Sequence, residues 1–230
     1  MRLQPLAFSV ALLASAAFGQ RHVSIPVASA PSGSPAQIQA DVYGSGERGL
    51  ILAHGGRFNK ESWRKQAEAF ARAGFLAVAI DYRGDTVNND GSPSALGSDA
   101  ENATDVLAAA AWLREQRATS ISAIGASLGG DAVGEADAQS GDRTFDRVVF
   151  LASEGGSNPS MLKGRKLYIV ARHDTSGYGP RLPGISKCYA QAPEPKKLVV
   201  LKGAAHAQFL FYTAQGPHVM NEILRFLQGK

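Results

Sequence analysis

The sequence lacks several features that mark whole classes of protein. Its 230 residues include one cysteine, Cys188, so no disulfide can form within the chain, and we expect this side chain to be buried as a small apolar group. The 24 Lys and Arg residues nearly balance the 20 Asp and Glu residues without forming a basic run, so nucleic acid is not an expected partner. Internal repeats and low-complexity tracts are also missing, which favours an ordinary globular protein.

Signals for cofactors and metals are lacking too. The chain has no Walker-type phosphate loop, and in its Gly-rich segment at 125–130 Ser127 stands where a dinucleotide-binding turn needs glycine. His22, His173 and His218 do not have the paired spacing of metal ligands. We therefore predict neither a cofactor nor a metal.

Long hydrophobic runs are absent after the first twenty residues. Residues 1–19 contain one charge, Arg2, then an apolar run at 6–14 and a small-residue site at 17–19, which is the pattern of a secretory signal peptide. The run is short for a transmembrane helix. We predict a signal peptide over 1–19, a single domain over 20–230 without a membrane span, and a secreted or periplasmic location. An uncleaved membrane anchor is the alternative.

Short apolar runs alternate with longer helical patterns along the rest of the chain. This alternation predicts an α/β domain, with a mostly parallel sheet covered by helices on both faces. Runs at 21–28 and 38–43 predict an antiparallel hairpin at the sheet edge. Six more runs predict strands buried on both faces, at 50–53, 75–80, 121–124, 148–151, 167–171 and 198–201. The predicted sheet therefore has eight strands.

Apolar residues at helical spacing predict three amphipathic helices. Gly74 is placed to end the first helix. A capping-box pattern that begins at Ser98 opens the second, and Pro217 and Gly229 mark the start and the end of the third. The predicted buried stripes are Trp63, Ala67 and Phe70; Val106, Ala110 and Leu113; and Val219, Ile223 and Phe226.

The strongest chemical signal is the segment Gly-Ala-Ser-Leu-Gly at 125–129, between a predicted strand and a predicted helix. A serine on such a tight turn is exposed as a nucleophile, and small neighbours let the strand and the helix approach each other. Gly125, Gly129 and Gly130 meet that need. Ser127 is therefore the candidate nucleophile, and an ordinary Gly-rich turn is the alternative.

Two further residues stand in the order that a catalytic triad requires. Asp174 follows the predicted strand at 167–171, and His206 follows the strand at 198–201. Open α/β sheets place their sites at these carboxyl ends of strands. A serine hydroxyl needs an imidazole to take its proton, and the imidazole needs a carboxylate to hold it. Ser127, Asp174 and His206 fill these roles.

These motifs resemble the α/β-hydrolase superfamily across the whole predicted mature chain, and in detail its small lidless esterases and dienelactone-hydrolase-like or peptidase-like members. The resemblance also rests on His-Gly-Gly at 54–56 and Asp-Tyr-Arg-Gly at 81–84. It implies an oxyanion hole formed by the backbone N–H groups of Gly56 and Leu128, with Arg57 as the alternative to Gly56. Asp81 is the alternative to Asp174 as the acid.

The resemblance implies a serine hydrolase that transfers an acyl group from an ester, thioester or activated amide to Ser127 and then to water, with a small-molecule acyl substrate as its partner. A peptidase, an acyltransferase and a catalytically silent ligand-binding relative are the alternatives. Dienelactone hydrolases proper use Cys as the nucleophile, so Ser127 argues against that specific activity. The sequence does not predict an oligomeric state.

The substrate expected from the resemblance is short and soluble. Relatives with a lid insert a cap after the sixth strand, and here only residues 153–164 are available, so no cap domain is expected. The loop at 82–97 is the segment placed to cover the site instead. The aromatic residues Phe209, Phe211 and Tyr212 line an acyl pocket in one interpretation and pack in the core in the other.

Overall fold

An eight-stranded sheet, in the order β1-β2-β4-β3-β5-β6-β7-β10, forms the centre of the computed structural model. The structure describes residues 19–27, 36–83, 98–142 and 144–229. The predicted signal peptide, the hairpin turn after β1 and most of the 82–97 loop lie outside these residues. The strands are β1 (Arg21–Val27), β2 (Ala36–Tyr43), β3 (Arg48–Ala53), β4 (Leu76–Ile80), β5 (Ser120–Ala126), β6 (Arg147–Leu151), β7 (Arg165–Ala171) and β10 (Lys196–Leu201).

The direction of the strands matches the prediction. β1 and β2 pair antiparallel, and β2 joins β4 antiparallel at the edge of the sheet. Along the order β4-β3-β5-β6-β7-β10, each strand pairs in parallel with the next. The predicted mostly parallel α/β sheet is confirmed. A small hairpin of β8 (Thr175–Ser176) and β9 (Gly179–Pro180) was not predicted, because two-residue strands carry no hydrophobic period.

The last strand differs from its prediction. The run at 198–201 predicts burial on both faces, yet Leu198, Val199 and Val200 of β10 are only partly buried. β10 is the edge strand, with β7 as its single neighbour in the sheet. Apolar composition does not distinguish an edge strand from a central one, so only the strand order corrects this prediction.

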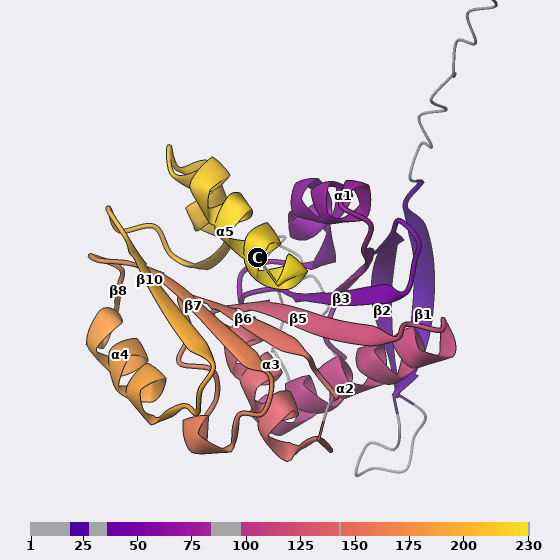
Figure 1. The fold of residues 1–230 in the computed structure, drawn as a ribbon, viewed down its shortest axis with the longest axis horizontal. Helices are drawn as coiled ribbons and strands as arrows, with labels where there is room; N and C mark the ends of the chain where they lie inside the picture. Colours follow the sequence, from indigo (N-terminus) through magenta and orange to yellow (C-terminus); the bar gives the residue numbers. More distant parts are fainter. Residues whose placement is uncertain (1–18, 28–35, 84–97, 143, 230) are drawn as a thin grey trace, which may run out of the picture.

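Helices cover both faces of the sheet, as Figure 1 shows. α1 (Arg64–Arg72) and α5 (Gly216–Gln228) lie on one face; α2 (Asp99–Glu115), α3 (Leu128–Gln139) and α4 (Leu182–Gln191) lie on the other. Each face has its own apolar core, one centred on Trp63 and Phe70 and the other on Val106 and Phe150. Burial of these side chains, at about 25 cal/mol per Å² of apolar surface, is the main force that holds the layers together.

The predicted ends of all three helices are confirmed, and α5 has Pro217 in its first turn and Gly229 at φ +74° after its last. After α1, Gly74 has φ +84°, and its N–H donates to Ala71 O at 3.0 Å, which closes the last turn. Before α2, Ser98 and Glu101 form a reciprocal capping box. The carboxylate of Glu101 accepts hydrogen bonds from the backbone and side chain of Ser98, which lower its pKa below the ordinary value.

The buried stripe of α5 differs from the prediction by one residue. Val219 and Ile223 are buried, but Leu227 is buried in place of Phe226, which packs at the margin of the core. Phe226 and Leu227 lie three and four residues after Ile223, so both are close to its helical face. The helical period therefore does not predict which of the two side chains is buried. Packing against the neighbouring strands determines it.

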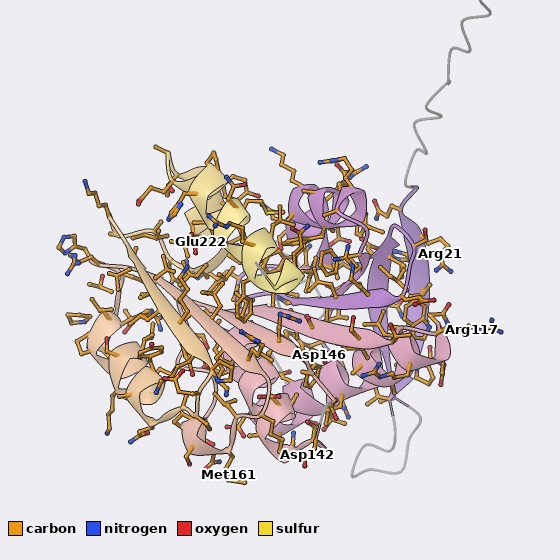
Figure 2. All side chains as sticks on the ribbon, in the orientation of Figure 1. Arg21, Arg117, Asp142, Asp146, Met161 and Glu222 are labelled. Atoms are coloured by element: carbon orange, nitrogen blue, oxygen red, sulfur yellow. The ribbon has the colours of Figure 1, made fainter. Side chains whose placement is uncertain are left out.

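Glu222, labelled in Figure 2, lies on α5, and its carboxylate accepts a hydrogen bond from Lys197 Nζ of β10 at 2.5 Å. Lys166, by contrast, is a buried cation. It is 1% exposed, its Nζ donates to Pro193 O at 3.0 Å, and burial lowers its pKa.

Cys188 is buried as predicted, and burial together with the nearby Glu154 raises its pKa to about 11. Across the described ranges, no helix has the length and apolarity needed to span a membrane.

Candidate active site

Ser127 lies at the turn between β5 and α3. Its backbone angles are φ +52° and ψ −122°, a combination that costs about 1–3 kcal/mol outside glycine. Hydrogen bonds hold it there: its N–H donates to Leu151 O at 2.9 Å, and its carbonyl accepts from Gly130 N at 2.7 Å. The surrounding structure therefore imposes a strained conformation that lifts the side chain out of the sheet.

The glycines around Ser127 are required by close backbone approach. A Cβ on Gly125 would lie 2.1 Å from Gly129 O, and one on Gly129 would lie 2.4 Å from Ala53 O. A Cβ on Gly130 would lie 2.4 Å from the Ser153 side chain. Any larger residue would push α3 away from β3 and β5. These contacts explain why the segment at 125–130 is rich in glycine.

The structure brings together the three side chains that the sequence places far apart. Ser127 Oγ lies 2.9 Å from His206 Nε2, and Asp174 Oδ2 lies 2.8 Å from His206 Nδ1. Because a carboxylate only accepts, Nδ1 carries the proton and Nε2 is left to accept from the serine hydroxyl. This hydrogen-bonded chain joins the ends of β5, β7 and β10.

Burial differs strongly along this chain. The side chain of Asp174 is 1% exposed, whereas that of His206 is 29% exposed. Asp174 has a second neighbour, Arg181, whose Nε lies 3.7 Å from Oδ1. The Arg181 N–H also donates to the Asp174 carbonyl at 3.0 Å. The carboxylate is thus held in a dry site with one cation beside it, while the imidazole faces the open side.

Asp81, the alternative acid, has other partners. Its Oδ1 accepts from Lys60 N and its Oδ2 accepts from Lys60 Nζ, both at 2.7 Å, and His54 Nε2 lies 3.8 Å away. Burial opposes the charge of Lys60, but the hydrogen bonds to Asp81 and Glu61 outweigh it and raise the Lys60 pKa. Asp81 therefore fastens the 3-10 helix η1 (Lys60–Trp63) to the end of β4. The structure places Asp174, not Asp81, against His206.

The candidate oxyanion loop follows β3 and faces Ser127. A Cβ on Gly55 would lie 3.1 Å from Ala126 O and 3.5 Å from Ser127 Cβ, so this loop packs against the elbow. Leu128 is the first residue of α3, where backbone N–H groups have no acceptor inside the helix. Gly56 and Arg57 both line the cavity in front of Ser127. Gly56 and Arg57 thus border the same cavity as Ser127, and Leu128 follows Ser127 directly in the chain.

A cavity of about 380 Å³ opens in front of Ser127, and we call it the reaction pocket. It is lined by Gly55, Gly56, Arg57, Phe58, Ser127, Thr175, Arg181, His206, Ala207 and Phe209. Phe58 and Phe209 form its apolar wall, with their rings edge to face at 5.2 Å. Phe211 packs against Trp63 instead, and Tyr212 is exposed. Of the three predicted pocket aromatics, only Phe209 lines the cavity.

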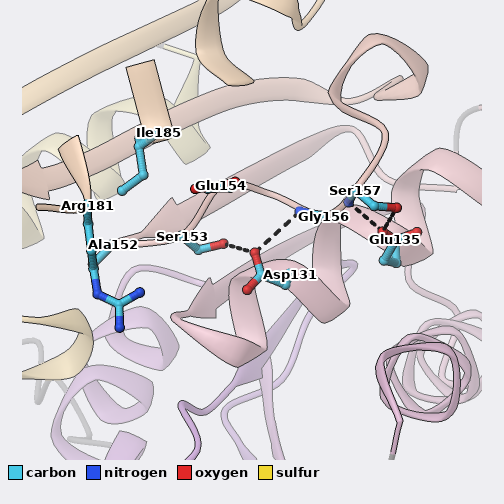
Figure 3. A pocket seen from close by; sticks show the side chains of 9 residues that line it. All are labelled: Asp131, Glu135, Ala152, Ser153, Glu154, Gly156, Ser157, Arg181 and Ile185. Carbon is cyan, nitrogen blue, oxygen red and sulfur yellow. Dashed lines mark hydrogen bonds between the residues drawn. The ribbon is translucent and has the colours of Figure 1, made fainter. Parts of the chain in front are cut away.

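A second cavity, of about 310 Å³, lies beside the reaction pocket and shares Arg181 with it (Figure 3). We call it the acidic pocket. It is lined by Asp131, Glu135, Ala152, Ser153, Glu154, Gly156, Ser157, Arg181 and Ile185. Its α3 carboxylates bind the loop after β6: Asp131 accepts from Ser153 Oγ at 2.8 Å, and Glu135 accepts from Ser157. Figure 3 shows these bonds, with Arg181 on the other side.

In the part of the chain that the structure describes, no three His, Cys, Asp or Glu side chains gather as a metal site would require. His22 binds the buried carboxylate of Asp41 through Nδ1 at 2.5 Å. That contact fastens β1 to β2.

Sequence reasoning missed several residues of the site. Arg181 comes from the start of α4 and Thr175 from the β8–β9 hairpin, and neither stands in a recognisable motif. Phe58 follows the Gly-Gly pair directly, but its role as a wall depends on Phe209, which is distant in the chain. Gln208, two residues after His206, carries no sequence signal either, yet it bonds to the Gly55 backbone at 3.0 Å.

The strand order, the elbow at the end of β5 and the residues that follow β7 and β10 define the α/β-hydrolase fold. A dienelactone hydrolase from Anabaena variabilis is 19% identical and superposes with a TM-score of 0.66, covering 91% of this chain and 98% of its own. An esterase from Pyrococcus furiosus is 14% identical, with a TM-score of 0.72 over 92% of this chain and 91% of its own. An esterase from a Rhodococcus species is 16% identical, with a TM-score of 0.65 over 91% and 98%.

These likenesses confirm the predicted fold and its resemblance to dienelactone-hydrolase-like and esterase structures. At such identities they show the fold alone. No protein-family model matches the chain, and no curated protein sequence matches it.

The predicted lack of a cap domain is also confirmed at the position where relatives carry one. Every residue between β6 and β7 is described, and this connection contains only the short 3-10 helix η2 (Pro159–Met161). The connection packs against α3 and forms one wall of the acidic pocket.

Proposed function

We propose that the protein is a serine hydrolase that cleaves an ester, a thioester or an activated amide through an acyl-enzyme on Ser127. The observation that carries the proposal is the hydrogen-bonded chain from Ser127 Oγ through His206 to Asp174, which begins at a strained elbow and opens into a cavity. The hydrolases and esterases among the structural neighbours support the same reaction class.

In the first half of the reaction His206 acts as the base. Its Nε2, 2.9 Å from Ser127 Oγ, takes the hydroxyl proton as the oxygen attacks the substrate carbonyl carbon. The imidazolium that forms is stabilised by Asp174, which also fixes the tautomer. His206 then returns the proton to the leaving alcohol, thiol or amine. A water molecule repeats the sequence and releases the acid.

The oxyanion of each tetrahedral intermediate needs donors that are in place before the reaction. The Leu128 N–H at the start of α3 and the Gly56 N–H of the loop after β3 fill this role in our proposal. Each such donor contributes roughly 10²–10³-fold to kcat in hydrolases of this kind. The positive end of α3 adds to the stabilisation of negative charge at the elbow.

The substrate class in our proposal is a short, soluble acyl compound. The connection between β6 and β7 is too short to supply a cap domain, and the volume of the reaction pocket, about 380 Å³, suits a small ligand. Phe58 and Phe209 offer an apolar wall for a short acyl chain.

We also propose that the chain is exported with cleavage after residue 19. The first strand begins at Arg21, so this cleavage would leave the sheet complete. Mass spectrometry of exported protein should find a mature N-terminus near Gln20. Recovery of an intact N-terminus on the exported protein would favour a membrane anchor.

Labelling with a fluorophosphonate probe tests the function directly. The wild-type protein should be labelled once, and Ser127→Ala should lose both labelling and ester hydrolysis while its thermal unfolding midpoint stays close to that of the wild type. Labelling that persists in the Ala variant would remove Ser127 as the nucleophile. An unlabelled and inactive wild type would favour a silent ligand-binding protein, and faster cleavage of amides than of esters would favour a peptidase.

A further inference from the structure

The oxyanion loop contains two consecutive glycines, Gly55 and Gly56. Glycine has the largest conformational freedom of any residue, so a Gly-Gly pair does not hold an N–H group in place by itself. Close contact with Ala126 O and Ser127 Cβ leaves little space for a side chain at Gly55. The loop must therefore be fixed by bonds from other parts of the chain.

The carbonyl end of this loop is held locally. Gly55 O accepts hydrogen bonds from Phe58 N and from His54 Nδ1, both at 2.9 Å. The peptide between Gly55 and Gly56 is trans, so the Gly56 N–H points opposite to the Gly55 carbonyl. The two bonds to Gly55 O thus set the direction of the predicted oxyanion donor.

The amino end of the loop is held from a distant position. Gly55 N–H donates to Gln208 Oε1 at 3.0 Å, and Gln208 is 1% exposed. Gln208 Nε2 in turn donates to Ser62 Oγ at 2.5 Å, and Ser62 Oγ donates to Asn59 O at 2.5 Å. The backbone N–H requires an oxygen acceptor, so this network also fixes which end of the amide faces Gly55.

Gln208 is close to the base in the chain. It lies two residues after His206, in the 3-10 helix η3 (Ala207–Tyr212). One buried amide therefore connects the segment that carries the base with the loop that carries the predicted oxyanion donor. Transition-state stabilisation by fixed donors depends on keeping such groups within a fraction of an ångström of their productive positions.

We propose that Gln208 is a positioning residue, whose side-chain amide holds the Gly55-Gly56 loop in register with His206 and Ser127. The inference rests on the proposed hydrolase function. Its effect should fall on the transition state, where the oxyanion exists, and little on substrate binding. Loss of Gln208 should therefore lower kcat and leave KM almost unchanged.

Two substitutions of similar size separate the hydrogen bond from the volume of the side chain. Gln208→Met fills the space without an acceptor for Gly55 N–H, and Gln208→Glu keeps an acceptor there. We expect Gln208→Met to lower kcat about 10- to 100-fold, less than loss of an oxyanion donor outright, with KM within about twofold. Gln208→Glu should stay within about fivefold of the wild type. The measurement is hydrolysis of p-nitrophenyl acetate.

A transition-state mimic provides a readout that a purely structural role would not change. A short-chain methyl trifluoromethyl ketone forms a hemiketal with the serine and places an oxyanion in the hole. Its inhibition constant should rise in Gln208→Met by about the same factor as kcat falls. The shape of the pH profile of kcat/KM should be the same in the wild type and in Gln208→Met.

The matched control is Gln66→Met. Gln66 is a buried glutamine on α1, 7% exposed, and it is not among the residues that line the reaction pocket. We expect this variant to keep kcat within about twofold. Equal losses in Gln66→Met and Gln208→Met would assign the effect to general destabilisation and overturn the proposal. Equal losses in Gln208→Met and Gln208→Glu would overturn the role of the hydrogen bond.

Gln208→Asn serves if the Met variant does not fold, because it keeps an amide but is too short to reach Gly55. It should lose kcat in the same direction, and wild-type kcat in a folded Asn variant would overturn the proposal. A Gln208→Met variant with wild-type kcat, beside an inactive Ser127→Ala, would overturn the positioning role and leave the hydrolase function standing. A wild type that is neither labelled nor active overturns both.

Discussion

The reaction pocket and the acidic pocket lie side by side, are similar in volume and share Arg181, but they use their polar groups differently. In the reaction pocket, hydrogen bonds link a hydroxyl, an imidazole and a carboxylate in series. In the acidic pocket, the carboxylates of Asp131 and Glu135 accept hydrogen bonds from Ser153 and Ser157 of the loop after β6.

The difference shows why neither charge nor volume alone identifies a site. The acidic pocket has three carboxylates in its lining, yet two of them hold the backbone and hydroxyl groups of one loop. The carboxylate that serves the reaction pocket is Asp174, which is buried behind His206 and bonds to it. What distinguishes the two cavities is the direction of the hydrogen bonds, toward a loop in one and toward a nucleophile in the other.

The largest effect should come from the carboxylate behind the reaction pocket. Asp174→Asn should lower kcat up to roughly 10⁴-fold without unfolding the protein, because an amide can stabilise the wrong tautomer of His206 and cannot balance its positive charge. Steady-state kinetics of ester hydrolysis provide the measurement. Asp81→Asn is the companion variant, and a large loss there with near-normal activity in Asp174→Asn would show that the acid is misassigned.

The next effect is the response to acid. The imidazolium form of His206 cannot accept the serine proton, so kcat/KM should fall as the solution is made more acidic. A profile measured from pH 4 to pH 9 tests this, and constant activity down to about pH 4 would contradict a histidine base.

The third effect concerns the size of substrate that the reaction pocket accepts. Without a cap between β6 and β7, p-nitrophenyl acetate or butyrate should be hydrolysed faster than the palmitate, and the rate should show no jump when substrate passes its solubility limit. Initial rates across this series measure it. Preference for palmitate with interfacial activation would mean that another segment, such as the loop at 82–97, covers the site.

The smallest effect should come from the acidic pocket. Glu135→Ala removes the acceptor of Ser157 N and Oγ, so the loop after β6 should loosen, at a cost of about 1 kcal/mol in the free energy of unfolding. We expect kcat to stay within about threefold. Thermal unfolding and ester hydrolysis, measured together, test the pair. If kcat falls more than threefold while the variant is still folded at the assay temperature, the acidic pocket is part of the reaction site.

Much of the fold follows from local patterns in the chain. The alternation of short apolar runs with helical spacing predicts eight strands and helices on both faces, because burial on both sides of a sheet demands continuous apolar strands. The ends of α1 and α2 follow from Gly74 and Ser98, since their capping bonds reach only a few residues. The two errors in predicted burial, at β10 and at the end of α5, occur where two interpretations fit the same pattern.

The candidate nucleophile, base and acid are also visible in the sequence, because each must follow a strand in a fixed order. The chain by itself determined Ser127, Asp174 and His206 as candidates. It favoured Asp174 as the acid and kept Asp81 as the alternative, because both follow a strand. The approach of Asp174 Oδ2 to His206 Nδ1, at 2.8 Å, is a contact across 32 residues that only the folded sheet creates.

Tertiary structure alone decided which residues surround these groups. Arg181, Phe58 and Gln208 stand in no motif, since their contacts join segments that the chain does not place together. Gln208 meets Gly55 from a position 153 residues further along the sequence. Local periodicity reports which face of an element is buried, whereas the distance between two loops depends on strand order, twist and packing, which no single segment encodes.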